Sequence, residues 1–60
     1  MNKQHYADMG EFKVSAVRDE NGKFMHFVVV DRNGDLALNE KFEIASEAME
    51  AGYKKFKGLV

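Results

Sequence analysis

The tetrapeptide Asp-x-Asn-Gly occurs twice in the chain, as Asp19-Glu20-Asn21-Gly22 and as Asp31-Arg32-Asn33-Gly34, and these two stretches decide the fold. Asp favours the first position of a type I turn, and Gly tolerates the positive φ that is needed where the chain reverses. Apolar, β-branched and aromatic runs flank the turns. The repeat therefore predicts two consecutive hairpins, a three-stranded antiparallel β-meander with strands near residues 11–18, 23–30 and 35–39, the last extending at most to residue 42.

The residues after the predicted meander have the pattern of one helix. Ser46 is a preferred N-cap residue, Glu47 falls in the first turn, and Gly58 stands where a glycine commonly ends a helix. Residues at helical spacing form one apolar stripe: Ala45, Ala48, Met49, Gly52, Tyr53 and Phe56. Gly52 in mid-helix costs about 1 kcal/mol relative to Ala, which a close approach of the helix to the sheet would explain. The predicted fold class is α+β, in the order β-β-β-α, with the C-terminal helix packed on one face of the sheet.

The length and composition indicate one small domain. Residues 1–10 are polar with isolated apolar members, so we expect a flexible or loosely packed arm there and a single domain over residues 11–60. The 60-residue chain has no cysteine, which leaves packing or association to stabilise it, and 45% of its residues are hydrophobic. We therefore expect a partner protein, a homodimer, or both.

The geometry of the two turns determines which side chains share a face. Two-residue turns would pair Glu20 with Lys23, whereas type I turns with a glycine bulge pair Asp19 with Lys23 and Asp31 with Asp35. We favour the bulged turns, because they give the helix a nearly complete apolar layer. That layer is Phe12, Val14, Ala16, Phe24, His26, Val28, Val30, Leu36 and Leu38.

The opposite face of the predicted sheet is also apolar at its centre. It would carry Lys13, Ser15, Val17, Met25, Phe27, Val29, Ala37 and Asn39. One helix covers one face of a three-stranded sheet, so Val17, Met25, Phe27 and Val29 form the predicted partner-binding surface. Two alternatives stay open. The N-terminal arm could fold back and cover this surface with Tyr6 and Met9, or association could use a strand edge.

Residue patterns for catalysis, metals and cofactors are missing from the sequence. His26 is expected on the helix side as a packed residue, and His5 lies in the arm without neighbouring ligands. The stretch Asp31-x-Asn33-x-Asp35 begins like a calcium loop, but Leu36 and Phe42 occupy the positions that require Gly and Glu. We expect no catalytic residue, no metal site and no cofactor, hence a non-enzymatic protein.

Residues 42–58 carry an aromatic residue, a short connection, a Ser cap, Glu47-Ala48, an aromatic at Tyr53 and a closing Gly58. This pattern resembles the three-stranded DNA-binding domains of phage integrase N-termini and of plant ethylene-response factors. The resemblance implies an alternative function, DNA binding through the sheet face and the lysines at the end of the helix. The candidate residues are Lys13, Lys54, Lys55 and Lys57. The formal net charge of −1 disfavours this alternative.

The favoured function is a binding or regulatory module that acts by protein–protein contact. In size and style the chain resembles accessory and inhibitor proteins of bacteria and phages. The longest apolar run, Phe27-Val28-Val29-Val30, is far too short for a membrane span, and no signal-peptide pattern follows Met1. We expect a soluble protein in the cytoplasm.

Overall fold

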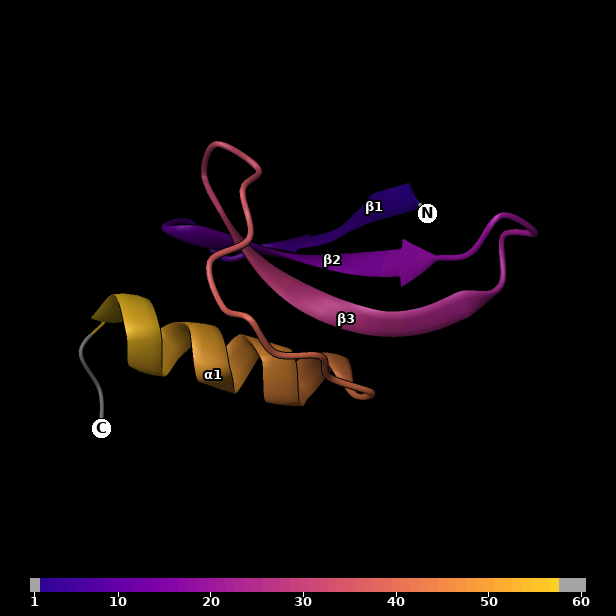
Figure 1. Ribbon diagram of the computed structural model, residues 1–60. Coiled ribbons are helices and arrows are strands. Elements are labelled where there is room, and N and C mark those ends of the chain that lie inside the picture. The colour runs from indigo at the N-terminus through magenta and orange to yellow at the C-terminus, as the bar shows by residue number, and fades with distance from the viewer. Residues whose placement is uncertain (1, 58–60) are drawn as a thin grey trace.

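The computed structural model describes residues 2–57 and the side chains of residues 2–56, so Gly58 and the side chain of Lys57 lie outside the described residues. Three strands form one antiparallel sheet in the order β1-β2-β3: β1 (Asn2–Asp8), β2 (Phe12–Arg18) and β3 (Phe24–Asp31). The helix α1 (Ala45–Lys57) follows and packs along one side of the sheet (Figure 1). The β-β-β-α fold class predicted from the sequence is confirmed.

The identity of the first and third strands differs from the prediction. Residues 2–8, which were predicted to be a loose arm, form β1 and pair with β2 along their whole length. A tight turn joins them: Gly10 has a φ of 94°, and its N–H donates to Oδ1 of Asp8 at 2.9 Å. Backbone hydrogen bonds to β2 hold β1 in place, so its polar side chains do not prevent strand formation.

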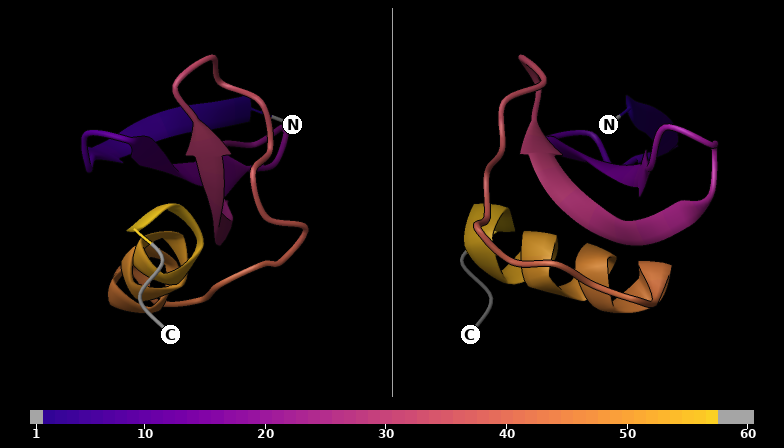
Figure 2. Two further views of the ribbon diagram at one scale, coloured as in Figure 1. Left: turned by 90° about the vertical axis from the view of Figure 1, so that its left-hand side faces the viewer. Right: turned by 45° about the vertical axis from the view of Figure 1, so that its right-hand side comes forward.

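The predicted third strand, residues 35–39, is not a strand. After the second turn the chain touches β3 at two isolated bridges, Val30 with Leu36 and Phe27 with Phe42. Between the two bridges it leaves the ladder, and after the second bridge it runs to the start of α1 (Figure 2). The segment therefore lies along the outer edge of β3 without extending the sheet.

Both Asp-x-Asn-Gly turns adopt the predicted bulged geometry. The N–H of Asp19 donates to the carbonyl of Lys23 at 3.0 Å, and that of Asp31 donates to the carbonyl of Asp35 at 2.8 Å. Gly22 and Gly34 have φ values of 81° and 91°. In each turn Oδ1 of the Asp accepts two backbone N–H groups, each at 2.9 Å, from the residues two and four positions further on. This side chain holds the turn closed, which is why Asp recurs at the position.

A β-bulge next to the first turn changes the faces of β3. Arg18 pairs with Phe24, and the next pair is Val17 with His26, so Met25 is an extra residue without a partner in β2. The extra residue shifts the alternation by one position. Phe27 and Val29 therefore lie on the helix side, opposite Ala16 and Val14, and the prediction that put them on the other face is wrong.

The main core lies between the sheet and α1. Phe12, Val14, Val29 and Ala48 are buried at its centre, and these partly buried residues pack around them: Ala7, Met9, Phe27, Ala37, Leu38, Phe42, Met49 and Phe56. Gly52 lets the helix approach, since a Cβ built there would lie 2.6 Å from Cδ2 of Phe12. Its predicted role is confirmed. The helix begins at Ala45, and the carbonyl of Ile44 accepts the first helical hydrogen bond, so Ser46 is inside the helix and the N-cap predicted there is wrong.

The side of the sheet that faces away from α1, called the far side below, is the concave side of a curved sheet. β3 bends through a wide arc with α1 on the outside of the bend (Figures 1 and 2). Val17, Val28 and Val30 form a second buried cluster, and the register places all three on the far side. Across this side Nζ of Lys3 donates to the carbonyl of Gly34 at 3.3 Å, which links β1 to the second turn. The compact valines fit inside the bend, and the larger Phe27 packs on the outside.

Candidate functional site

Three aromatic side chains, Tyr6, Phe24 and Phe27, form a continuous cluster that we call the aromatic patch. The rings of Tyr6 and Phe27 are 4.9 Å apart and meet edge to face, and those of Phe24 and Phe27 are 4.8 Å apart. Tyr6 is 54% exposed and Phe24 37% exposed. Large exposed rings in mutual contact form the kind of apolar surface that marks an interaction site.

Two bulges on the edge strands assemble this patch. The bulge at Met25 turns Phe27 to the helix side, and Tyr6 is the extra residue of a bulge between His5 and Ala7 in β1. Tyr6 contacts Phe27, and Ala7 packs in the helix-side core, so consecutive residues of β1 point to the same side. β2 lies between these two edge strands, and its residue paired with Phe27 is the small Ala16. The small side chain leaves room for the ring of Tyr6 to extend over β2 and reach Phe27.

The aromatic patch lies toward the end of the sheet that the helix leaves uncovered. In Figure 1 the hairpin between β2 and β3 extends past the start of α1. Polar contacts border the patch: Arg18, the partner of Phe24 in the ladder, donates from Nε to Oε1 of Gln4 at 2.9 Å and from a terminal nitrogen to the carbonyl of Gly22 at 3.0 Å. An apolar centre with a polar border is typical of protein interfaces.

The four residues predicted to bind a partner do not form one surface. Val17 and Val29 are both buried and lie on opposite sides of the sheet. Met25 is exposed at the bulge, and only Phe27 belongs to the aromatic patch. The single bulge at Met25 accounts for the difference, because it exchanges the two faces of β3 relative to an uninterrupted ladder.

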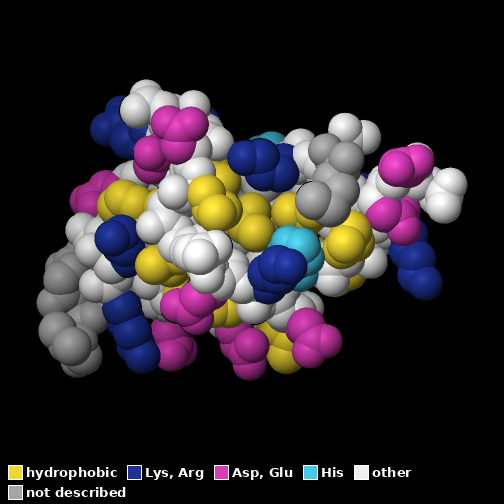
Figure 3. Space-filling view, viewed as in Figure 1, with side chains coloured by type: hydrophobic (Ala, Val, Ile, Leu, Met, Phe, Trp, Pro, Cys, Tyr) yellow, Lys and Arg dark blue, Asp and Glu magenta, His cyan; other side chains and the backbone are white. Residues whose placement is uncertain are grey.

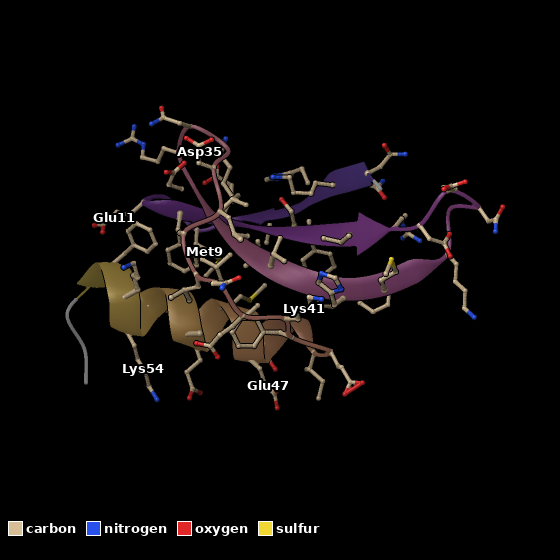
Figure 4. All side chains as sticks on the ribbon, in the orientation of Figure 1. Met9, Glu11, Asp35, Lys41, Glu47 and Lys54 are labelled. Atoms are coloured by element: carbon tan, nitrogen blue, oxygen red, sulfur yellow. The ribbon has the colours of Figure 1, made fainter. Side chains whose placement is uncertain are left out.

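The alternative in which the N-terminal segment covers apolar residues is close to what the structure shows, with a different geometry. Tyr6 does lie against Phe27, and Met9 packs against the helix-side core (Figure 4). They do so as parts of a paired strand and its turn, on the helix side. Tyr6 remains more than half exposed, so the patch is incompletely covered.

The lysines proposed for nucleic-acid contact are spread over separate parts of the molecule. The register puts Lys13 on the far side of the sheet, paired with Asp8. Lys54 projects from α1 away from the sheet and forms an ion pair with Glu50 at 3.6 Å, and Lys55 is exposed on the same helix (Figure 4). The side chain of Lys57 lies outside the described residues. DNA binding stays a prediction, without one surface that gathers these cations.

The histidines occupy the far side. The register pairs His5 with Ser15 and His26 with Val17, so the prediction of His26 on the helix side is wrong, again because of the bulge at Met25. Among residues 2–57 no group of three or more His, Cys, Asp or Glu side chains is placed to hold a metal ion. In Figure 3 hydrophobic side chains reach the surface in a band interrupted by Lys, Arg and His side chains, and several Asp and Glu side chains gather along the lower edge of the view.

Two members of the patch, Tyr6 and Phe24, were missed as site residues. A signal for Tyr6 was present, because Asp8-Met9-Gly10 precedes the strand at Phe12 and has the Asp and Gly of the other two turns. Reading it as a turn would have placed residues 2–8 in the sheet. Phe24 lies on the helix side as predicted, but that Phe27 shares this side depends on the bulge, for which the sequence has no comparable signal.

Within the described residues, no helix has the length and apolarity needed to cross a membrane. Comparison of the chain with protein-family models, with curated proteins and with solved structures finds no match in any of the three.

Proposed function

We propose that this chain is a small non-enzymatic module that acts by protein–protein contact through the aromatic patch of Tyr6, Phe24 and Phe27. The observation that supports the proposal is their exposed ring cluster, at an end of the sheet that the helix does not cover. Aromatic side chains are enriched at the centres of protein interfaces, where they bury much area with few rotatable bonds. Self-association, a different protein partner, or both would use this surface.

Charge favours a protein over a polyanion as the partner. The chain has nine basic and ten acidic residues, and Arg18, which borders the patch, uses its hydrogen bonds within the molecule. Electrostatic attraction to nucleic acid requires several cations on one surface. As part of the proposal we place the module in the cytoplasm, with an accessory or inhibitory role of the kind small bacterial and phage proteins perform.

The test compares two substitutions that each remove an exposed apolar side chain. Phe24→Ser removes one ring of the patch, and Leu36→Ser is the matched control beyond the second turn, where Leu36 is 51% exposed. Immobilised wild type and variants are exposed to lysate of the source organism, and concentration-dependent sedimentation measures self-association. We expect Phe24→Ser to weaken specific association at least tenfold, as interface aromatics commonly do, and Leu36→Ser to leave it unchanged.

Two results would contradict the proposal. One is that Phe24→Ser retains every interaction of the wild type while folding normally by circular dichroism. The other is retention of duplex DNA at about 50 mM salt that the combined change Lys54→Glu and Lys55→Glu abolishes, since this would make the phosphate backbone the ligand.

A further inference from the structure

The two edges of the sheet differ in how their backbone groups are used. Residues 35–42 occupy the outer edge of β3: the N–H of Ala37 donates to the carbonyl of Val29 at 2.9 Å, and Phe27 and Phe42 exchange hydrogen bonds in both directions. β1 is the other edge, and in the described part of the chain its residues pair with β2 alone. A seven-residue strand with one free edge is a template for pairing with a further strand.

We propose that a second copy of this chain pairs with β1, antiparallel and across a two-fold axis, to make one continuous six-stranded sheet. The register places Lys3 of each copy opposite Asp8 of the other. This proposal rests on the proposed function in naming self-association as one use of the aromatic patch, and it adds a second contact, the open edge of β1.

The bulge in β1 determines which registers bring together residues on the same side. Lys3, His5 and Asp8 lie on the far side of the sheet, and Gln4, Tyr6 and Ala7 lie on the helix side. With Lys3 opposite Asp8, and Gln4 opposite Ala7, the outer pairs bring together residues on the same side of the joined sheet. A slip by one residue in either direction sets far-side residues opposite helix-side residues at the outer pairs, whereas the proposed register confines this mismatch to the centre, where His5 lies opposite Tyr6 and the bulges of the two strands meet. A slip by two residues, with His5 opposite Asp8, matches the sides at every pair but separates Lys3 from Asp8, so charge is what selects the proposed register.

Charge supports the same register. The strand carries one cation, Lys3, and one anion, Asp8, near its opposite ends. Antiparallel pairing therefore creates two Lys3–Asp8 pairs between the copies, one at each end of the ladder, and no pair of like charges. Opposite charges directly across an antiparallel pair stabilise it, and like charges destabilise it. In the dimer the exposed side chain of Lys3 would exchange the carbonyl of Gly34, a neutral acceptor, for the carboxylate of Asp8, with which a charge-assisted bond is stronger.

The aromatic patch lies beside the joined edge. The two-fold axis passes between His5 and Tyr6, so the backbones of the two Tyr6 residues are neighbours across the axis. Each Tyr6 ring extends over β2 to Phe27 of its own copy, away from the axis, so the patches of the two copies remain two separate surfaces on the helix side of one dimer.

A charge exchange tests the register by sedimentation equilibrium up to about 1 mM protein, which detects dissociation constants at the weak end of the range for specific association. Lys3→Glu alone should weaken self-association about tenfold or more, because two attractive pairs become two repulsive ones. Asp8→Lys should weaken it as well, but it also removes the acceptor for the N–H of Gly10 and sets a lysine opposite Lys13, so its effect counts for the dimer only together with the rescue in the mixture. An equimolar mixture of the two single variants should associate again, as should the double variant. Lys23→Glu, a charge reversal at an exposed residue of the first turn, is the matched control and should change nothing.

A cross-link tests the geometry independently, since the chain has no cysteine. Lys3→Cys combined with Asp8→Cys should form a disulfide-linked dimer under mild oxidation. The two positions are about 16 Å apart within one strand and cannot bridge inside one chain. Lys3→Cys combined with Gln4→Cys keeps the number of thiols, brings no two cysteine positions of different copies closer than about 10 Å along the ladder, and should remain monomeric.

Several outcomes would overturn the dimer. They are a monomer at the highest concentration, a dimer that survives both single charge reversals, or equal cross-linking of the two cysteine pairs. If the chain is monomeric while Phe24→Ser still abolishes binding of another protein, the dimer is excluded and the proposed function stands. If the dimer forms as described and Phe24→Ser affects neither it nor any other interaction, the proposed function fails and the β1 interface stands.

Discussion

The two ends of the sheet are closed by the same tetrapeptide, yet their surroundings are opposite. At the second turn Phe12, opposite Asp31, is fully buried: its ring stacks on Phe56 at 5.5 Å and lies against Gly52 of α1. At the first turn Phe24 is exposed, and the ladder contains a bulge before it is regular again. The same tetrapeptide thus forms both turns. The bulge and the position of the helix determine that the residues beside the second turn are buried and those beside the first turn are exposed.

The largest expected effect on stability comes from deleting single residues of β3. A deletion can move the β3 side chains to the opposite side of the sheet, and so abolish the difference between the buried and the exposed end. Deletion of Met25 removes the bulge and leaves Arg18–Phe24 and Val17–His26 as consecutive pairs, so each side chain keeps its side. We expect it to lower the free energy of unfolding by no more than about 1 kcal/mol, as Met25 is already exposed.

Deletion of Val28 is the matched control, and the chain should barely fold. With Val29 kept in place, Phe27 would move to the far side and His26 would replace it beside the core. Full burial of one such apolar side chain is worth about 1.5–3 kcal/mol, against about 3–9 kcal/mol of total stability for a domain of this size. Urea unfolding followed by circular dichroism measures both. Equal tolerance of the two deletions would mean that the faces of β3 do not depend on the Met25 bulge.

The turns show what the sequence makes predictable. Asp, Asn and Gly act through their own backbone and nearest neighbours, so the positions of the two reversals follow from local residues, and the approach of α1 follows from Gly52. The bulged geometry was favoured for the apolar layer that it would give the helix, and it is confirmed although His26, Val28 and Val30 of that layer lie on the far side. The third strand was assigned to residues 35–39 because Leu36 and Leu38 alternate with other residues as in a strand. That segment must also reach the start of the helix, a requirement of the whole chain that the local pattern does not contain.

The aromatic patch was less predictable for a related reason. β1 is polar, and an edge strand held by backbone hydrogen bonds needs little side-chain pattern. The bulge at Met25 lets Phe27 pack outside the bend of the sheet, while Val28 and Val30 fit inside it. The position of the bulge thus depends on the curvature of the assembled sheet, and no residue near Met25 predicts it.

The next largest effect concerns the buried end. Gly52→Ala gains about 1 kcal/mol of helix propensity but places a methyl group against the ring of Phe12, which is enclosed on all sides. We expect a net loss of about 1–3 kcal/mol, the usual range for overpacking, which lowers the thermal midpoint by several degrees. Phe12→Leu should relieve the overlap. In the double variant the loss should be smaller than the sum of the two single losses, as a thermal double-mutant cycle would show. Additive losses would argue against close contact at this point.

The smallest expected effect is a difference in stability between the same substitution made in each of the two turns. Gly22→Ala and Gly34→Ala are the same change in the same motif, at φ values of 81° and 91°, and a Cβ at either position meets no atom within 4 Å. Backbone strain of about 1–2 kcal/mol is therefore the whole local cost at both sites. We expect the full cost at Gly22, which lies between two paired strands. At Gly34 a smaller cost is expected, because the chain after it is held to β3 by isolated bridges and can open locally to release the strain.

Hydrogen exchange at Ala37, which donates to Val29, reports that opening. A larger loss for Gly34→Ala than for Gly22→Ala, without faster exchange at Ala37, would show instead that the second turn is held as firmly as the first.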